Sequence, residues 1–473
     1  MTEITETPAA QAPEEKKPED EINAEEATNG NHNGESETNG DAQEESGEKT
    51  EPPKEMRAIV LTSFGGFKGL KVLKKPEPAP QAGEVLIRVK ACGLNFQDVI
   101  VRLGAIDSPP KTPCILGFEC AGEIEAVGEG VTNFEVGDRV VALPEFKAWA
   151  ELVAVSESYV YKIPANMTFT EAAAITLNYL VAHILVNDLA VVRPGNSVLL
   201  HSAGGGVGLA VAQLCKLVGD VTLFGVASKS KHETLEPLGL ITNLLERNGD
   251  YLNEVRKLQP QGVDIVLDCL CGEECNKGYS LLKPMGKYVL YGSANVVTGE
   301  TKSFFSVARS WWQVDKVSPI KLFDENKSLM GFNLRHLLYQ QGDFGASYVR
   351  GTVEKVFALW NEGKIQPTVD TTWALEDVAD AMQKMHDRKN IGKLILDPAQ
   401  TPKPKPATPA KGKSKDKKQV IEEKNGDKEK KTDGDAEAEE KKDEEKTEEN
   451  GSNGDQASDE KSASTNGEDK PSS

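Results

Sequence analysis

One segment constrains the fold more than any other: a glycine-rich loop between an apolar run and a helical pattern. The apolar run ends at His201, and the loop then reads Ser-Ala-Gly-Gly-Gly-Val-Gly from Ser202 to Gly208. A helical pattern follows over residues 207–218. In such a strand–loop–helix unit, glycines allow a tight turn and bring pyrophosphate close to backbone N–H groups at the helix N-terminus. The segment therefore predicts a parallel-sheet domain that binds a dinucleotide.

The dinucleotide fingerprint carries one substitution. Ala203 stands in the place of its first glycine, whereas Gly205 and Gly208 keep the second and third. Gly206 and Val207 lie between them and complete the turn. We expect these five residues to form the cofactor-binding loop.

The residues that follow the next apolar run predict which nucleotide binds. An NAD site normally places an acidic residue there, on the ribose 2′-hydroxyl. Residues 221–232 contain no Asp or Glu and offer Ser228, Lys229 and Lys231 instead. Hydroxyl and ammonium groups suit a 2′-phosphate, so the sequence predicts NADPH as cofactor. The alternative is that these lysines merely face water at the start of a helix.

The pattern of apolar runs divides the chain into domains. Residues 56–178 hold short apolar runs separated by glycines, which is typical of a small β-barrel. Residues 179–315 alternate strand and helix patterns, which is typical of a doubly wound parallel sheet. A last apolar run at 392–397 is expected to return to the barrel, so residues 316–397 are assigned to the first domain. The expected fold class is α/β plus β.

The two ends of the chain differ in composition from the middle. Residues 1–55 contain 17 acidic residues and 4 Lys, and residues 398–473 contain 20 acidic residues and 16 Lys. Of the net charge of −20 they carry −13 and −4, which leaves −3 for the middle. Without aromatic residues they cannot bury enough apolar surface to fold, so disordered tails are expected. The nearly neutral middle argues against nucleic acid as a partner.

No targeting signal, membrane span or metal cluster is expected. The first residues lack an apolar stretch, and no run of 18 apolar residues occurs. Cys269, Cys271 and Cys275 lie close in sequence but have no paired His at zinc-site spacing, so we interpret them as packing thiols. The aromatic segment 304–312 is interpreted as core or a dimer edge, with an apolar patch at a cleft mouth as the alternative.

Several motifs together resemble a known superfamily. In order they are GLNFQD from Gly93, GFECAG from Gly117, VGEGV from Val127, GDRV from Gly137 and the Ala203 loop. This set resembles the quinone oxidoreductase branch of the medium-chain (zinc-containing alcohol dehydrogenase) superfamily. Further stretches are similar to the vesicle amine transport proteins, also called synaptic vesicle membrane protein homologs: SKSKHE (228–233), SLLKPMG (280–286), VTGETKSFFSVARSWWQ (297–313) and NIGKLIL (390–396). DCLCG (268–272) resembles the VAT-like paralogues.

The resemblance implies a GroES-like barrel with an inserted Rossmann domain, and it implies that zinc is absent. Asn95 stands where zinc members carry the first Cys ligand, and Phe118 stands in place of the His, followed by Glu119. Without a metal, we expect direct hydride transfer from NADPH to a quinone or enone. Asn95 is then a candidate catalytic residue beside the nicotinamide. Asp98 is either a second one or a structural acid that pins the turn.

Other implied features concern the cofactor and the partners. Tyr291 follows a Rossmann strand at its carboxyl end, where such sheets bind ligands. Related reductases show Asn/Asp-Tyr near the adenosine, whereas this chain reads NLLER over 243–247. The implied assembly is a homodimer. The resemblance also implies a cytoplasmic protein, peripheral on vesicles or the mitochondrial outer membrane, with phospholipid or mitofusin-type partners. A cofactor-gated membrane-surface or partner-binding module is therefore the alternative to an enzyme.

Overall fold

The structure is a computed structural model that describes residues 54–297 and 317–404. All described residues belong to one compact unit. The expected tails lie outside the described residues, apart from 54–55 and 398–404, and so does the aromatic segment 304–312.

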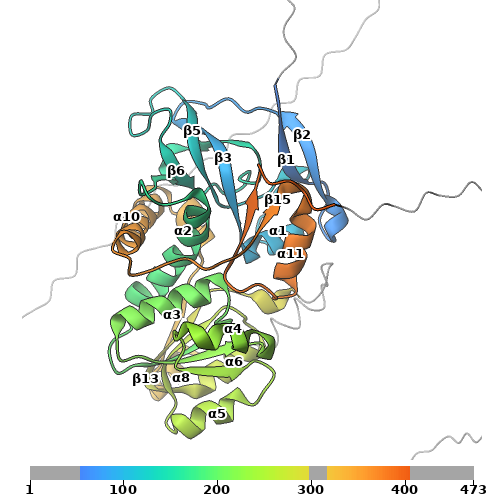
Figure 1. The fold of residues 1–473 in the computed structure, drawn as a ribbon. Helices are drawn as coiled ribbons and strands as arrows, with labels where there is room; N and C mark the ends of the chain where they lie inside the picture. The colour runs from blue at the N-terminus through green and yellow to red at the C-terminus, as the bar shows by residue number, and fades with distance from the viewer. Residues whose placement is uncertain (1–53, 298–316, 405–473) are drawn as a thin grey trace, which may run out of the picture. The chain divides into compact units, whose positions relative to one another are not determined.

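The first domain is a barrel-like arrangement of mostly antiparallel strands (Figure 1). Its sheets have the orders β15-β16-β3-β5-β6-β8, with β7 also paired to β3, and β2-β1-β4. The strand bounds are β1 (Glu55–Leu61), β2 (Leu70–Pro76), β3 (Glu84–Leu94), β4 (Cys114–Ile115), β5 (Cys120–Val127), β6 (Arg139–Ala142), β7 (Leu152–Ser156), β8 (Val160–Lys162), β15 (Val369–Ala374) and β16 (Lys393–Asp397). Since β16 pairs with β3, the expected return of the C-terminal strand to the barrel is confirmed.

The second domain is a six-stranded sheet in which every pairing is parallel, in the order β11-β10-β9-β12-β13-β14. Its strands are β9 (Ser197–His201), β10 (Thr222–Ala227), β11 (Asn243–Glu246), β12 (Val263–Asp268), β13 (Leu282–Leu290) and β14 (Ser328–Gly331). In β9, Val198 and Leu200 join one core cluster whereas Leu199 joins another. A strand buried on both faces reads as a continuous apolar run, which is why the sequence identified it.

Ten α-helices cover these sheets in the described part of the chain (Figure 1). They are α1 (Phe96–Arg102), α2 (Phe169–His183), α3 (Gly206–Val218), α4 (His232–Leu235), α5 (Tyr251–Leu258), α6 (Glu273–Leu281), α8 (Pro319–Glu325), α9 (Leu334–Gln340), α10 (Gly342–Asn361) and α11 (Val378–His386). The expected architecture, a GroES-like domain with an inserted Rossmann-type sheet, is thereby confirmed.

The boundary expected at residue 316 needs correction. Strand β14 pairs with β13 in the parallel sheet, so the chain still contributes to that sheet at Gly331. β14 has four residues, three of them exposed, and such a short edge strand has no apolar alternation to reveal it. Helix α2 likewise continues across the boundary expected between residues 178 and 179.

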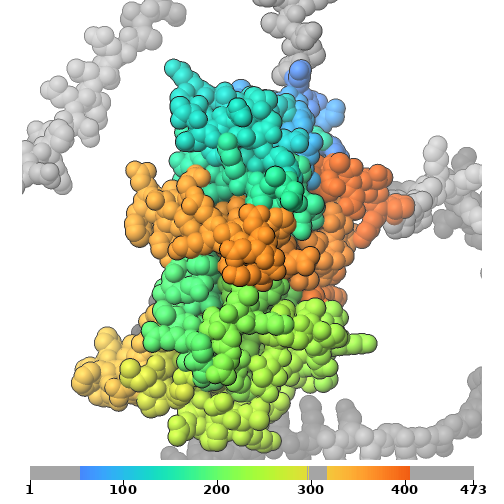
Figure 2. All heavy atoms as spheres, turned by 60° about the vertical axis from the view of Figure 1, so that its left-hand side comes forward, coloured from blue at the N-terminus to red at the C-terminus, as the bar shows by residue number. Residues whose placement is uncertain are grey.

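Helix α10 joins the two domains. Its Arg350 donates to the carbonyl of Val160 in the barrel, and its Tyr348 donates to the Asp188 carboxylate in the π-helix η3 (Ile184–Leu189). In Figure 2 this orange helix lies between the teal barrel residues and the green residues below. Helix α10 thus connects η3 to the barrel.

One described stretch is long and apolar enough to cross a bilayer. It spans Phe169–Leu189, with a mean hydropathy of 1.4. Of its most apolar window, 78% is buried inside the fold, as is typical of a core helix. This stretch comprises α2 and η3, and it packs against α3.

Candidate active site

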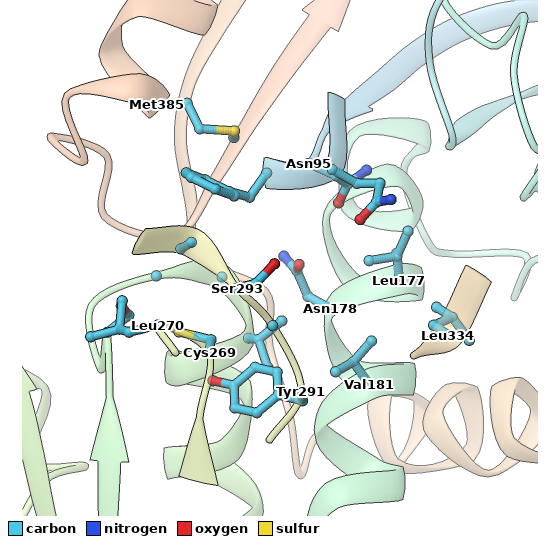
Figure 3. A pocket seen from close by; sticks show the side chains of 18 of the residues that line it. Asn95, Leu177, Asn178, Val181, Cys269, Leu270, Tyr291, Ser293, Leu334 and Met385 are labelled. Atoms are coloured by element: carbon cyan, nitrogen blue, oxygen red, sulfur yellow. The ribbon is translucent and has the colours of Figure 1, made fainter. Parts of the chain in front are cut away.

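A cavity of about 720 Å³ lies where the barrel meets the carboxyl ends of the parallel strands. The glycine loop and the segments after β10, β12 and β13 form one side, and α1, α2, α9 and Lys393 of β16 contribute the other. Figure 3 shows Asn95, Asn178 and Ser293 directed toward the same region, with Val181 and Leu177 beside them. Ligands bind at this edge of an open α/β sheet.

The glycine loop has the geometry of a phosphate cradle. Gly205 precedes the first turn of α3, and no side chain caps that helix. Gly205, Gly206 and Val207 line the cavity. A Cβ on Gly208 would lie 2.5 Å from the Ser202 carbonyl oxygen, so this tight turn requires glycine. Free N–H groups at a helix N-terminus suit an anion such as pyrophosphate.

The expected first-glycine position has a different role. Ala203 is fully buried, does not line the cavity, and donates its N–H to the Val226 carbonyl at 3.1 Å. It therefore ties the loop to β10.

A basic cluster occupies the cavity next to the end of β10. Ser228 and Lys231 line it as expected, together with Arg247 and Arg388, whereas Lys229 does not. The Lys231 ammonium lies 2.6 Å from the Asn390 carbonyl, and Arg388 donates to the Ala294 carbonyl at 2.9 Å. Among the described residues, no carboxylate comes within ion-pair distance of these three cations.

The pKa values in this cluster are consistent with uncompensated positive charge. Burial lowers the pKa of Lys231 to about 8; Asp370 opposes the shift, while Arg247 and Arg388 add to it. Burial, then Arg247, lowers the pKa of Arg388 to about 10. A dianionic ligand would supply the missing countercharge.

Arg247 and Arg388 were missed by the sequence analysis. Arg247 ends the NLLER stretch, the region in which related reductases show Asn/Asp-Tyr, so the departure from that pattern was a visible signal. Arg388 follows α11, more than 150 residues from the glycine loop, and nothing local marks it.

Asn95 lies in the cavity wall at the start of α1. Its backbone N–H donates to the Asp98 carboxylate at 2.8 Å, and its amide lies between Glu119 and Lys393. Asp98 itself is buried and does not line the cavity. Burial raises the pKa of Asp98 well above its usual range. The geometry thus favours the structural alternative for Asp98, which pins the turn that presents Asn95.

The region near Asn95 is mostly apolar. Phe96, Ile100 and Phe118 line it from the barrel side, and Leu177 and Val181 line it from α2. Tyr291 lies on the opposite wall, as expected, and burial raises the pKa of its phenol well above the usual value. Asn178, which the sequence analysis did not single out, adds a second amide. Such walls exclude water from a planar, apolar acceptor.

The residues at the expected zinc-ligand positions are not zinc donors. Zinc requires thiolate, imidazole or carboxylate donors in a tetrahedral arrangement. An amide and a phenyl ring, those of Asn95 and Phe118, stand at the expected ligand positions. In residues 54–297 and 317–404, no group of three or more His, Cys, Asp or Glu side chains is arranged to hold a metal ion.

Two family models match the chain. The alcohol dehydrogenase GroES-like domain matches residues 81–165, and the zinc-binding dehydrogenase domain matches residues 246–396. The human synaptic vesicle membrane protein VAT-1 homolog-like is 57% identical over 350 residues, covering 74% of this chain and 83% of that protein. The human synaptic vesicle membrane protein VAT-1 homolog is 44% identical over 345 residues, covering 72% and 86%.

Solved structures give the same fold. The crystal structure of the human VAT-1 homolog-like protein superposes with a TM-score of 0.65 at 50% identity, covering 74% of this chain and 99% of that one. A mycobacterial protein solved with NADPH gives 0.63 at 29% identity, covering 72% and 100%. A quinone oxidoreductase from Pseudomonas syringae gives 0.63 at 26% identity, covering 72% and 100%. The fold is that of medium-chain oxidoreductases.

Proposed function

The chain belongs to the family of synaptic vesicle membrane protein VAT-1 homologs, within the medium-chain dehydrogenase/reductase superfamily, and on that premise we propose that it is a zinc-independent, NADPH-dependent reductase. Its acceptors are quinones or other activated carbonyl and alkene compounds. The observation that carries this proposal is the cavity itself, which joins a phosphate cradle and a cluster of cations to a mostly apolar chamber that includes the amides of Asn95 and Asn178.

NADPH is favoured over NADH by the cluster of Ser228, Lys231, Arg247 and Arg388. Lys231 is buried and Arg247 and Arg388 are half-buried, and a 2′-phosphate would offset the cost of holding three cations there without a carboxylate partner. A ribose 2′-hydroxyl would not. The mycobacterial relative solved with NADPH supports the same choice.

The chemistry follows from what each wall supplies. NADPH, when bound, supplies a hydride. The glycine loop and α3 hold the pyrophosphate through backbone N–H groups. The apolar walls exclude water and align a flat acceptor, which accounts for much of the rate in a reaction that needs no metal. Asn95 donates a hydrogen bond to the acceptor oxygen, where negative charge develops.

The test is NADPH consumption by the full chain against a panel that includes menadione and 4-phenyl-3-buten-2-one. We expect turnover with NADPH, with kcat/KM at least about 100-fold lower for NADH. Lys231→Ala should lower kcat/KM for NADPH about tenfold, whereas Lys257→Ala on the exposed face of α5 should not. Tight NADPH binding without turnover of any acceptor would contradict the enzyme proposal.

A membrane-surface or partner-binding role is the second candidate. It is favoured by exposed apolar side chains on α8, where Ile320 is 72% exposed and Phe323 is 81% exposed, and by the names of the relatives. The vesicle surface and the mitochondrial outer membrane are the proposed locations. Flotation with phosphatidylserine-containing vesicles, with and without NADPH, separates this role from the enzyme. A chain that never floats would exclude it.

We also propose a homodimer. Strand β14 lies at the edge of the parallel sheet, its Leu329 is 46% exposed, and α8 lies next to it in the chain. An edge strand with free backbone groups readily pairs with a second copy. Light scattering should give twice the chain mass, and Leu329→Asp should lower it. A monomeric wild-type chain would refute the dimer.

A further inference from the structure

Three buried side chains meet around one ammonium group beside the cavity. Lys393, the first residue of β16, places its Nζ 2.6 Å from Asn95 Oδ1 and 2.6 Å from Glu119 Oε2. The other oxygen of Glu119 accepts the backbone N–H of Leu177 at 2.8 Å. Lys393 is 2% exposed, Glu119 0% and Asn95 7%. Segments about 300 residues apart in the chain are thereby fixed to one another.

The ion pair lies directly against a glycine of β3. A Cβ on Gly93 would lie 2.3 Å from Glu119 Oε2 and 2.7 Å from Lys393 Cε. Gly93 pairs with Ile395 across β3 and β16, so the close approach is part of the sheet. Glycine at this position is what allows the ion pair to form beneath Asn95.

The ion pair also determines which way the Asn95 amide faces. An ammonium has only donors, so the atom 2.6 Å from it must be the amide oxygen. The amide nitrogen is then left with one long contact, 3.4 Å to Glu119. Because Asn95 lines the cavity, its remaining N–H is available to a ligand there (Figure 3).

We propose that Lys393, neutralised by Glu119, is a positioning residue that holds Asn95 with its amide N–H toward the acceptor oxygen. The proposal rests on the proposed reductase function. During reduction the hydride leaves the nicotinamide with both electrons and forms a C–H bond on the acceptor. The acceptor's π electrons move to its oxygen, and water later supplies the proton. The Asn95 N–H stabilises that oxygen, and the buried ammonium polarises the amide.

Two variants separate orientation from folding. Asn95→Asp keeps a partner for Lys393 but removes the N–H donor. The double variant Lys393→Met with Glu119→Gln removes both charges, so no buried ion is left unpaired. We expect kcat with menadione to fall about 100-fold in Asn95→Asp and about tenfold in the double variant, with unchanged affinity for NADPH. Lys257→Met, on the exposed face of α5, is the matched control.

Wild-type kcat in either variant would overturn the proposal, and so would a parallel loss of NADPH affinity and kcat. A second readout does not depend on turnover. In full chain labelled with 15N-asparagine, Asn95 is assigned by its absence from Asn95→Asp. Adding menadione with NADP+, which cannot react, should shift its side-chain NH2 signal in the wild type but not in the double variant. If the wild type shows that shift without any turnover, the reductase proposal fails while the positioning proposal stands. An unchanged wild-type signal refutes the positioning proposal.

Discussion

Lys231 and Lys393 are both buried lysines that line the cavity, yet their surroundings are opposite. Lys393 lies 2.6 Å from the Glu119 carboxylate, so its charge is already neutralised. Within residues 54–297 and 317–404, the acceptor of the Lys231 ammonium is the Asn390 carbonyl, and burial lowers the pKa of Lys231 to about 8. One end of the cavity therefore lacks an anion, and the other holds a completed ion pair.

This difference separates two tasks within one cavity. The end with Lys231, Arg247 and Arg388 is suited to gaining binding energy from a phosphate. The end with Lys393 is suited to holding an amide in one orientation, because the buried ion pair also binds the amide oxygen of Asn95. Affinity for the cofactor and alignment of the acceptor should therefore respond to different substitutions.

The largest effect on cofactor affinity should come from a side chain that fills the glycine loop. Gly208→Val places side-chain atoms against the Ser202 and Ala203 carbonyls, within 2.7 Å, so the turn must shift. We expect NADPH affinity to fall at least about 100-fold, or ~2.7 kcal/mol, although the basic cluster is intact. Isothermal titration of the full chain measures it.

The control for this prediction is Gly351→Ala in α10, where a Cβ would meet nothing within 4 Å. Its affinity for NADPH should match that of the wild type, and its stability should rise by up to about 1 kcal/mol. Equal affinity in Gly208→Val and the wild type would show that the cations alone hold the cofactor.

The two lysines should differ in what they contribute to stability. Lys393→Met leaves Glu119 buried and unpaired, which should lower the free energy of unfolding by about 3–5 kcal/mol. Lys231→Met removes a buried cation that has no carboxylate partner, so its cost should be below about 1 kcal/mol. Urea denaturation at neutral pH compares the variants. If both substitutions lower the free energy of unfolding equally, the proposed difference between the paired Lys393 and the unpaired Lys231 is wrong.

The smallest effect should be a pH dependence of NADPH affinity. It should arise at the end of the cavity that holds Lys231, Arg247 and Arg388. Only the protonated form of Lys231 attracts a 2′-phosphate, and its pKa in the free protein is lowered to about 8. NADPH affinity should therefore begin to weaken at about pH 7 and fall by up to about tenfold by about pH 9. NADH affinity should stay flat over that range. Parallel decline of both affinities would locate the titrating group elsewhere.

The parts predictable from sequence were those encoded by neighbouring residues. The strand, loop and helix around Gly205 are contiguous, and β9 lies where the apolar run predicted it. Ser228 and Lys231 follow β10 directly, so they were identified as well. Local patterns of spacing carry this information without any tertiary contact.

The start of α2 shows how a local signal can still be misassigned. Thr170, next to Glu171 and the alanines 172–174, is an N-cap candidate in the sequence, but the N-cap is Thr168, whose hydroxyl accepts the N–H of Glu171 at 3.1 Å. A Thr followed three residues later by Glu is a capping box, so the sequence did contain the correct signal. The N-cap of α2 could therefore be assigned from the sequence alone, because no distant contact determines it.

Other features required the fold. Arg388 and Lys393 reach the cavity only because β16 and the segment before it pack against the glycine loop, where Gly392 donates to the Gly204 carbonyl at 3.0 Å. Whether Asp98 acts in chemistry or in structure depended on its burial and on its bond to the Asn95 N–H. Neither these tertiary contacts nor the burial of Asp98 can be inferred from the order of residues in the sequence.

The most direct test of the account is a side-by-side titration of NADPH and NADH on the full chain and on Lys231→Ala combined with Arg388→Ala. The account predicts that the wild type prefers NADPH by at least about 100-fold and that this preference falls to about tenfold or less, with NADH affinity unchanged. Equal affinity of the wild type for the two cofactors, or a variant that keeps the full preference, would contradict it.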